Sequence, residues 1–293
     1  MNSVRKTRGD MMSDLKNKRI ITVATTGAWP TKEQNPNVPL QPHEIGEEIY
    51  QCWKLGASVA HVHVRDEEGK DSMKVETFKA VMDYVHENHP DCDVIFNLTA
   101  AGGIGNTEDE RMAPFMQLKP EMASFDCGTM NWMHFGVFNN NPPFLMKLGT
   151  AMQESGVKPE VEVFDIGMIH EAAWFLKNGY LKEPVHFQFC MGCAGGIPAT
   201  AENLILMRNA LREAVPNSTW SAFGVGKGAM EVMYTAIAAG GNIRVGMEDN
   251  IVYKKGQLAE SNMQLIARAR RVIEDFGCEV ATSEEARQIL GLK

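Results

Sequence analysis

The chain has 293 residues, of which 44% are hydrophobic and 23% charged, and its formal net charge is −8. This length fits two average domains or one large α/β barrel, and the apolar content is sufficient for a large core. The negative charge argues against a general nucleic-acid binder, which needs a basic face, and no apolar run approaches the roughly 18 residues of a membrane span.

Residues 1–19 are basic and contain no apolar segment of the kind found in secretory signals. We expect them to form a disordered extension that precedes one domain over 20–293. Six scattered cysteines in such a chain predict reduced thiols and a cytoplasmic location. The Cys190-Met-Gly-Cys193 motif has no second CxxC partner, which disfavours a redox or zinc role for it.

Eight short apolar or β-branched segments recur along the chain, and helix-like segments follow most of them. The expected strands are 20–26, 59–64, 94–99, 122–127, 160–164, 185–190, 220–225 and 242–247. Helical patterns that end near Gly or Pro cover 43–55, 75–88, 200–215 and 259–276. This alternation predicts a single-domain (β/α)8 TIM barrel, with catalytic groups at the carboxyl ends of the strands. A doubly wound open sheet fits less well, because no GxGxxG follows the first strand.

The second expected strand ends in HVHVRD, which places two histidines two residues apart. Residues i and i+2 of a strand point to one face, so His61 and His63 lie side by side. Two neutral imidazoles in this position can share a metal ion. The alternative is a pair of histidines with a purely structural role.

The eighth expected strand leads into two acids, Glu248 and Asp249. Strands two and eight flank strand one in a closed barrel, so Glu248 can converge with His61 and His63. Two histidines and one glutamate with open positions form a known catalytic zinc arrangement. Otherwise the two acids would be an ordinary solvated loop pair.

Other polar residues also fall near the carboxyl ends of strands. Glu162 in the fifth strand needs a partner inside a barrel, and Arg244 is the best candidate for an ion pair with it. Thr99 precedes the Ala-Ala-Gly-Gly-Ile-Gly loop, where a backbone can approach a ligand closely, and Ser124 lies in the fourth strand.

A glycine-rich segment follows the seventh strand and contains Gly224, Gly226 and Lys227. Barrels often bind phosphate at this place, through glycine amides and a helix N-terminus. The segment therefore predicts a phosphate site, although the same pattern can be a simple turn.

Several long motifs resemble the β-keto acid cleavage enzymes, the family first known as 3-keto-5-aminohexanoate cleavage enzyme. The likeness runs from about residue 20 to the C-terminus. Its most specific motifs are HVHVRD and GGNIRVGMEDNIVYKKGQLAESN, supported by TTGAWPTKEQNPNVPLQPHEI, TAAGGIG, KPEMASFDCGTMNW, PEVEVFDIGM and HFQFCMGCAGG. The resemblance implies a barrel with one divalent metal, usually zinc (Zn2+), and often a homotetramer.

The resemblance also implies an acyl exchange, in which a β-keto acid and acetyl-CoA give acetoacetate and a new acyl-CoA. It assigns the metal to His61, His63 and Glu248, and the catalytic group to Thr99, Arg244 and Asp249. Glu162 and Ser124 match further catalytic or substrate-binding pocket positions, and the phosphate predicted at Gly224, Gly226 and Lys227 would be that of CoA. Asp249, held by Arg244, is the expected base for the proton of the substrate methylene.

One position departs from the aminohexanoate-cleaving type, which carries Glu directly after the TGA of the first strand. This chain has Trp29 there. The loss of that carboxylate predicts weaker selection for a primary amine. Trp29 would then line a pocket for an uncharged acyl chain, or face a quaternary ammonium such as that of 3-dehydrocarnitine, through cation–π attraction of about 0.5–2 kcal/mol. A 3-keto-5-aminohexanoate-specific enzyme remains an alternative.

Three rival functions remain open at this point: a barrel hydrolase of the amidohydrolase type, a non-catalytic binding barrel with a structural metal, and a metal-dependent aldolase. The hydrolase type has its HxH on strand one and further histidines at the ends of strands five and six. Here HxH lies on strand two and His186 lies at the start of strand six. Only His170, after strand five, keeps the hydrolase possible.

Overall fold

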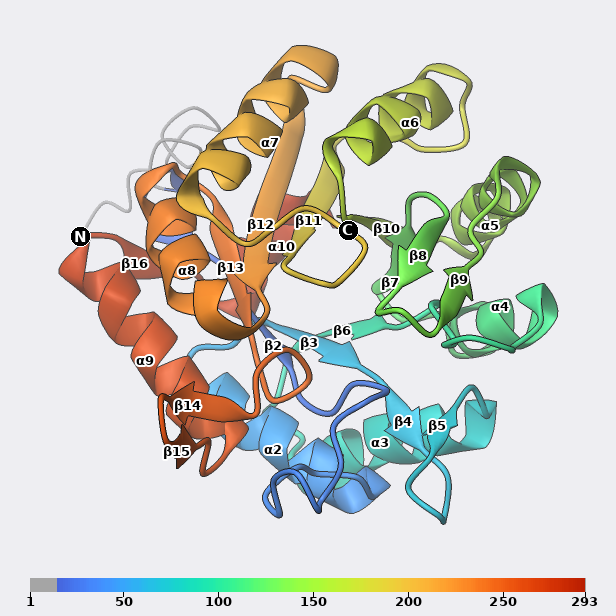
Figure 1. Cartoon of the computed structure of the whole chain (residues 1–293). Coiled ribbons are helices and arrows are strands. Elements are labelled where there is room, and N and C mark those ends of the chain that lie inside the picture. The colour runs from blue at the N-terminus through green and yellow to red at the C-terminus, as the bar shows by residue number, and fades with distance from the viewer. Residues whose placement is uncertain (1–14, 293) are drawn as a thin grey trace, which may run out of the picture.

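Eight parallel strands form a closed barrel in the computed structural model, which describes residues 15–292 (Figure 1). Each strand pairs with the next along the chain, and β13 closes the barrel against β2. The strands are β2 (Ile21–Ala24), β3 (Val59–Val62), β6 (Ile95–Leu98), β7 (Met122–Asp126), β10 (Lys158–Val163), β11 (Val185–Met191), β12 (Ser218–Gly224) and β13 (Asn242–Val245). All eight predicted strands and the predicted (β/α)8 barrel are confirmed.

Helices follow the strands and surround the barrel (Figure 1). They are α2 (Pro42–Lys54), α3 (Val75–Asn88), α4 (Glu108–Leu118), α5 (Pro142–Ser155), α6 (Ile166–Lys177), α7 (Ala201–Ala214), α8 (Ala229–Ala238), α9 (Asn262–Asp275) and α10 (Ser283–Leu290). The four predicted helices are present. The start of α9 was predicted three residues too early, because the Ser261 side chain caps the helix by accepting from the Gln264 amide. In the described part of the chain, no helix is long and apolar enough to cross a membrane.

The two mouths of the barrel differ. The first residues of the strands, such as Val59, Ile95 and Met122, pack against Ala286 and Leu290 of α10. This apolar cluster closes the amino-terminal mouth. The carboxyl-terminal mouth therefore remains for the site, as in other barrels of this type.

Short hairpins that the sequence did not predict follow three strands. They are β4–β5 (Val64–Arg65 and Asp71–Ser72), β8–β9 (Met130–Trp132 and Gly136–Phe138) and β14–β15 (Val252–Lys254 and Gln257–Leu258), after β3, β7 and β13 respectively. All three therefore rise from the carboxyl-terminal mouth and build its rim.

The predicted N-terminal extension falls largely on residues 1–14, which lie outside the described residues. Within its last part, β1 (Lys18–Arg19) pairs with β16 (Glu279–Val280). The chain is thus tied to the barrel wall just before β2.

Candidate active site

Two histidines and one glutamate from the two strands that flank β2 converge at the carboxyl-terminal mouth. His61 lies in β3 and His63 directly follows it, and both side chains are buried. The Nε2 atoms of His61 and His63 each lie 3.5 Å from Oε1 of Glu248. Because β3 and β13 flank β2 in the barrel, the structure brings together the three residues predicted to bind a metal.

This trio fits a small divalent cation. Ligands placed tetrahedrally about 2.1 Å from a zinc ion are about 3.4 Å apart, close to the 3.5 Å from Glu248 to each imidazole. Glu248 Oε2 is buried without a hydrogen-bond partner among the described residues. Two imidazoles and a carboxylate also form the donor set of catalytic zinc sites, so the residues present fit the metal.

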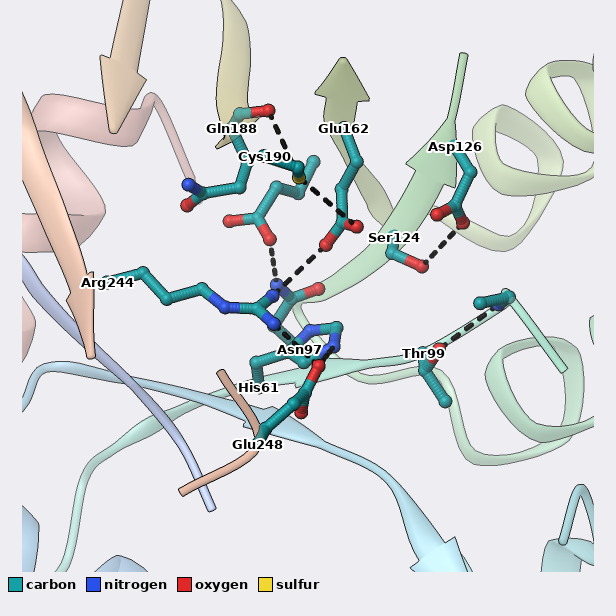
Figure 2. Close-up of polar contacts among 12 residues, drawn as sticks. His61, Asn97, Thr99, Ser124, Asp126, Glu162, Gln188, Cys190, Arg244 and Glu248 are labelled. Carbon is teal, nitrogen blue, oxygen red and sulfur yellow. Dashed lines mark hydrogen bonds and ion pairs between the residues drawn. The ribbon is translucent and has the colours of Figure 1, made fainter. Parts of the chain in front are cut away.

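Arg244 connects the acids of the site (Figure 2). Its Nε and Nη2 donate to both carboxylate oxygens of Asp249, at 3.0 and 2.8 Å. Nη2 also donates to Glu248 at 2.5 Å, and Nη1 donates to Glu162 at 3.2 Å. The predicted Arg244–Glu162 ion pair is therefore present. The guanidinium carbon lies 4.4 Å from the centre of the Phe223 ring, which supports its other face.

The adjacent acids Glu248 and Asp249 have opposite pKa shifts. Burial raises the pKa of Asp249 to about 6, although Arg244 opposes the shift. Burial by itself would also raise the pKa of Glu248. The neighbouring Arg244, His63 and His61 outweigh this effect and lower the pKa of Glu248 to about 2. Burial, reinforced by Asp126, raises the pKa of Glu162 well above its usual range. Glu248 is therefore an anion, whereas Asp249 can exchange a proton near neutral pH.

These residues form the floor of a cavity of about 620 Å³. Thr99 and Asp126 complete the polar floor, and the walls are mostly apolar and aromatic. The walls include Trp29, Ile104, Trp132, Met133, Phe135, Phe138, Phe164, Phe223, Val225 and Ile251. A polar floor under an apolar wall suits a small ligand with a charged head and a less polar tail.

Trp29 lines this cavity, and its role in substrate binding stays a prediction. Its ring stacks on Phe135, with centroids 5.4 Å apart and planes 22° apart. Phe135 comes from the β8–β9 turn, where Met133 and His134 adopt left-handed φ values of 46° and 64°. The hairpin and the β2–α2 loop therefore meet over the cavity.

Thr99 lies at the surface of the cavity, whereas Ser124 lies behind it. Thr99 lines the cavity, and its Oγ1 accepts from the Ala101 amide at 3.1 Å. Ser124 lies deeper and is not among the residues lining the cavity. Its hydroxyl accepts from the Ala100 amide at 3.0 Å and donates to Asp126 at 3.3 Å. Ser124 thus contacts residues of the cavity floor from the side away from the cavity.

The glycine-rich segment lies at the rim, where Val225 lines the cavity but Gly224, Gly226 and Lys227 do not. The Asn250 side chain hydrogen-bonds the backbone of this segment. The Gly226 amide donates to Asn250 Oδ1 at 2.7 Å, and Asn250 Nδ2 donates to the Gly224 carbonyl at 2.9 Å. Lys227 is exposed. The role of this segment in binding CoA phosphate stays a prediction.

Sequence reasoning missed Asp126, which ends β7 and lines the floor. The rule that polar residues at the carboxyl ends of strands form the site would have found it, since Asp126 shares a strand face with Ser124. Cys193 also lines the cavity. Burial raises its pKa to about 12 and raises that of Cys190 well above its usual range, so both thiols are protonated at neutral pH.

The histidines that a hydrolase would need lie elsewhere. His170 is exposed on α6 and does not line the cavity. His186 lies at the start of β11 and is buried below the site, where its Nδ1 is 2.8 Å from the Thr219 hydroxyl. Neither can complete the metal site with His61 and His63.

Comparisons with known sequences agree with one another. A family model described as beta-keto acid cleavage enzyme matches residues 18–292. A 3-keto-5-aminohexanoate cleavage enzyme from Fusobacterium nucleatum is 42% identical over 94% of this chain and 98% of its own. A 3-dehydrocarnitine:acetyl-CoA trimethylamine transferase from Rhizobium meliloti is 37% identical over 93% of this chain and 96% of its own.

Solved structures agree at the level of the fold. A ternary complex of ObcA with a C4-CoA adduct and oxalate superposes with a TM-score of 0.77 at 20% identity. The superposition covers 88% of this chain and 68% of that chain. At this identity the likeness concerns the barrel alone.

Proposed function

The chain belongs to the β-keto acid cleavage enzyme family, and on that premise we propose that it is an acyltransferase acting on a β-keto acid and acetyl-CoA. The products are acetoacetate and a new acyl-CoA. One observation carries the proposal: His61, His63 and Glu248 converge on the cavity floor directly beside the Arg244–Asp249 pair.

His61, His63 and Glu248 would hold the metal, for which zinc is our proposal. When bound, zinc supplies a Lewis acid that makes the methylene between the keto and carboxylate groups of the substrate more acidic. Arg244 adds a fixed positive charge beside Glu248, at 2.5 Å. That charge favours a substrate carboxylate and the anion that follows deprotonation.

Asp249 is the proposed base for the methylene proton. Arg244 holds both of its oxygens, and Glu162 contacts the same guanidinium from the other side. This bidentate grip fixes the direction of the carboxylate, which is the main requirement for proton transfer. The Thr99 hydroxyl lies on the cavity floor and can hydrogen-bond the substrate.

The exchange then balances without another reactant. Loss of the proton to Asp249 gives a carbanion, which forms a C–C bond to the thioester carbonyl and expels the CoA thiolate. The thiolate attacks the original keto carbon, and the C–C bond between that carbon and the methylene breaks. The new acyl-CoA forms, and Asp249 returns its proton to acetoacetate.

For the tail of the substrate we propose a neutral or quaternary-ammonium group rather than a primary amine, because an aromatic ring of Trp29 lines the cavity. The two relatives reported above are named for substrates that differ in the nitrogen of the tail, a primary amine in one and a quaternary ammonium in the other. CoA would approach from the rim, near Gly224, Gly226 and Lys227.

The test is acetoacetate formation by zinc-loaded protein from 3-ketohexanoate, 3-dehydrocarnitine and 3-keto-5-aminohexanoate, each with and without acetyl-CoA. We expect acetoacetate only when acetyl-CoA is present. Turnover that needs water but no CoA would support a hydrolase instead. A metal-loaded protein that is inert toward every β-keto acid would support the binding barrel.

A further inference from the structure

Asp126 faces the cavity from the strand opposite β13, which leads into Glu248, whereas β3 with His61 lies two places away. It is the last residue of β7, its exposed fraction is 2%, and it lines the cavity. In the closed strand order, β7 is four places from β13 in either direction. Figure 2 shows the same separation, with Asp126 across the site from Arg244 and Glu248.

This carboxylate has no ion-pair partner in the described part of the chain. Arg244 contacts Glu162, Glu248 and Asp249, whereas no Lys, Arg or His nitrogen lies within 4.0 Å of Asp126 among residues 15–292. The Ser124 hydroxyl, at 3.3 Å, is a long and neutral contact.

The nearby Arg111 does not fill this role. Its Nε, Nη1 and Nη2 donate to the Ala100 carbonyl, the Asn139 carbonyl and the Asn140 side chain, at 2.8, 3.1 and 2.6 Å. Burial raises the pKa of Asp126, and the more distant charges of Arg111 and His63, with hydrogen bonds to Ser124 and Glu162, offset this only in part. A cation delivered by a ligand would remove the cost of burying this carboxylate.

Aromatic rings line the same cavity. The β8–β9 hairpin follows β7 and contributes Trp132 and Phe138 to the wall. The Trp132 ring packs edge-on against Phe138 and Phe164, each with centroids 5.6 Å apart. Ring faces attract organic cations; the Phe138 ring already has the Arg111 guanidinium over its face, 5.2 Å from the ring centre, so the ring of Trp132 is the one that favours the same chemistry as Asp126.

We propose that Asp126 is a specificity-determining residue that binds a positively charged nitrogen on the substrate tail. The β-keto acid head would occupy the side of His61, His63 and Arg244, and the tail would extend across the cavity. This inference rests on the proposed function and narrows it: of the neutral and quaternary-ammonium tails proposed above, the quaternary ammonium is preferred.

The experiment compares kcat/KM for 3-dehydrocarnitine and 3-keto-5-aminohexanoate, which are cationic, with that for neutral 3-ketohexanoate. The proteins are the zinc-loaded wild type, Asp126→Asn, and Glu154→Gln as a control that removes an exposed carboxylate from α5. The wild type should prefer 3-dehydrocarnitine to 3-ketohexanoate at least tenfold. Asp126→Asn should reduce that ratio at least tenfold, mainly through the KM of the cation, and Glu154→Gln should leave it unchanged.

A ratio that is equal in Asp126→Asn and the control overturns the inference, as does a wild type that prefers the neutral substrate. If circular dichroism shows that the Asn variant is unfolded, Asp126→Ser provides the same ratio. Failure of the proposed function looks different: the wild type then forms no acetoacetate from any of the three acids, which overturns both.

Discussion

At the residue scale, different surroundings give the adjacent acids Glu248 and Asp249 different pKa values. Glu248 faces two histidines and Arg244, which lower its pKa to about 2. Asp249 has the same arginine but no imidazole within 4.0 Å among the described residues, and burial raises its pKa to about 6. The proposed division between a metal ligand and a proton acceptor therefore depends on the direction of two neighbouring side chains.

Replacing Asp249 tests this division. Asp249→Asn keeps the size of the side chain and removes the base, so kcat should fall by about 10²–10⁴-fold. Bound zinc should stay near one equivalent per chain, because His61, His63 and Glu248 are intact. Steady-state rates and metal content together check the prediction. A variant with a normal kcat would mean that another group accepts the proton.

Trp29 supplies the second prediction at this scale. Trp29→Glu adds a carboxylate at the mouth of the cavity and should raise kcat/KM for 3-keto-5-aminohexanoate relative to that for 3-ketohexanoate. Trp29→Gln is the matched control, since it loses the ring without adding charge. Ratios of kcat/KM measure the shift. Equal ratios in the Glu and Gln variants would show that charge at this position does not select the tail.

At the element scale, the approach of β13 to β2 sets the position of Glu248. A Cβ at Gly246 would overlap the Ala24 carbonyl, which in turn accepts from the Glu248 amide at 3.2 Å. Only glycine allows the two strands to meet so closely here. The GMED motif is thus a packing requirement as well as a chemical one.

Gly246→Ala should therefore push this turn away from β2. We expect a loss of about 1–3 kcal/mol in the free energy of unfolding, with weaker zinc binding. Gly167→Ala in α6 is the control, because a Cβ there meets nothing within 4 Å. Urea denaturation and zinc titration measure both effects. Should the two variants be equally stable, the turn would be more adaptable than its packing indicates.

The regular elements and the hairpins also differ in how well sequence predicted them. The strands and helices follow from periodicity and from capping residues such as Ser261. The β8–β9 hairpin has no such signal, because its turn uses left-handed Met133 and His134 rather than glycine. Contacts with other loops support it, among them the Met133 amide donating to the Ala194 carbonyl at 3.0 Å.

At the scale of the whole molecule, the barrel interior below the site is polar. His186 is buried, and its Nε2 lies 3.2 Å from the Ser221 hydroxyl. Burial, with a smaller effect of Lys158, lowers its pKa to about 3. Glu160 lies 3.7 Å away, and burial raises its own pKa to about 7. The histidine is therefore neutral in the folded state.

This shift predicts how stability depends on pH. The unfolded chain protonates His186 near pH 6.5, whereas the folded chain does so near pH 3. The stability that neutral His186 contributes is thus present above pH 6.5 and is lost as pH falls toward 3. From pH 6.5 to 5, the wild type should lose about 2 kcal/mol relative to His186→Gln.

Denaturation of both proteins at several pH values measures this difference. His86→Gln, at an exposed position on α3, should follow the wild type at every pH. A constant difference between the wild type and His186→Gln would show that His186 titrates alike in the folded and unfolded states.

The expected homotetramer and cytoplasmic location stay predictions.

The sequence by itself determined the eight strands, the convergence of His61, His63 and Glu248, and the Arg244–Glu162 pair. Side chains alternate along a strand, and strands follow one another around a barrel in chain order, so these relations can be derived from the sequence. Tertiary structure alone decided that Asp126 lines the same cavity as Glu248, that Ser124 lies behind the cavity floor, and that Phe135 stacks on Trp29. These relations join loops and strands far apart in the chain, and their distances depend on packing and burial, which no local pattern encodes.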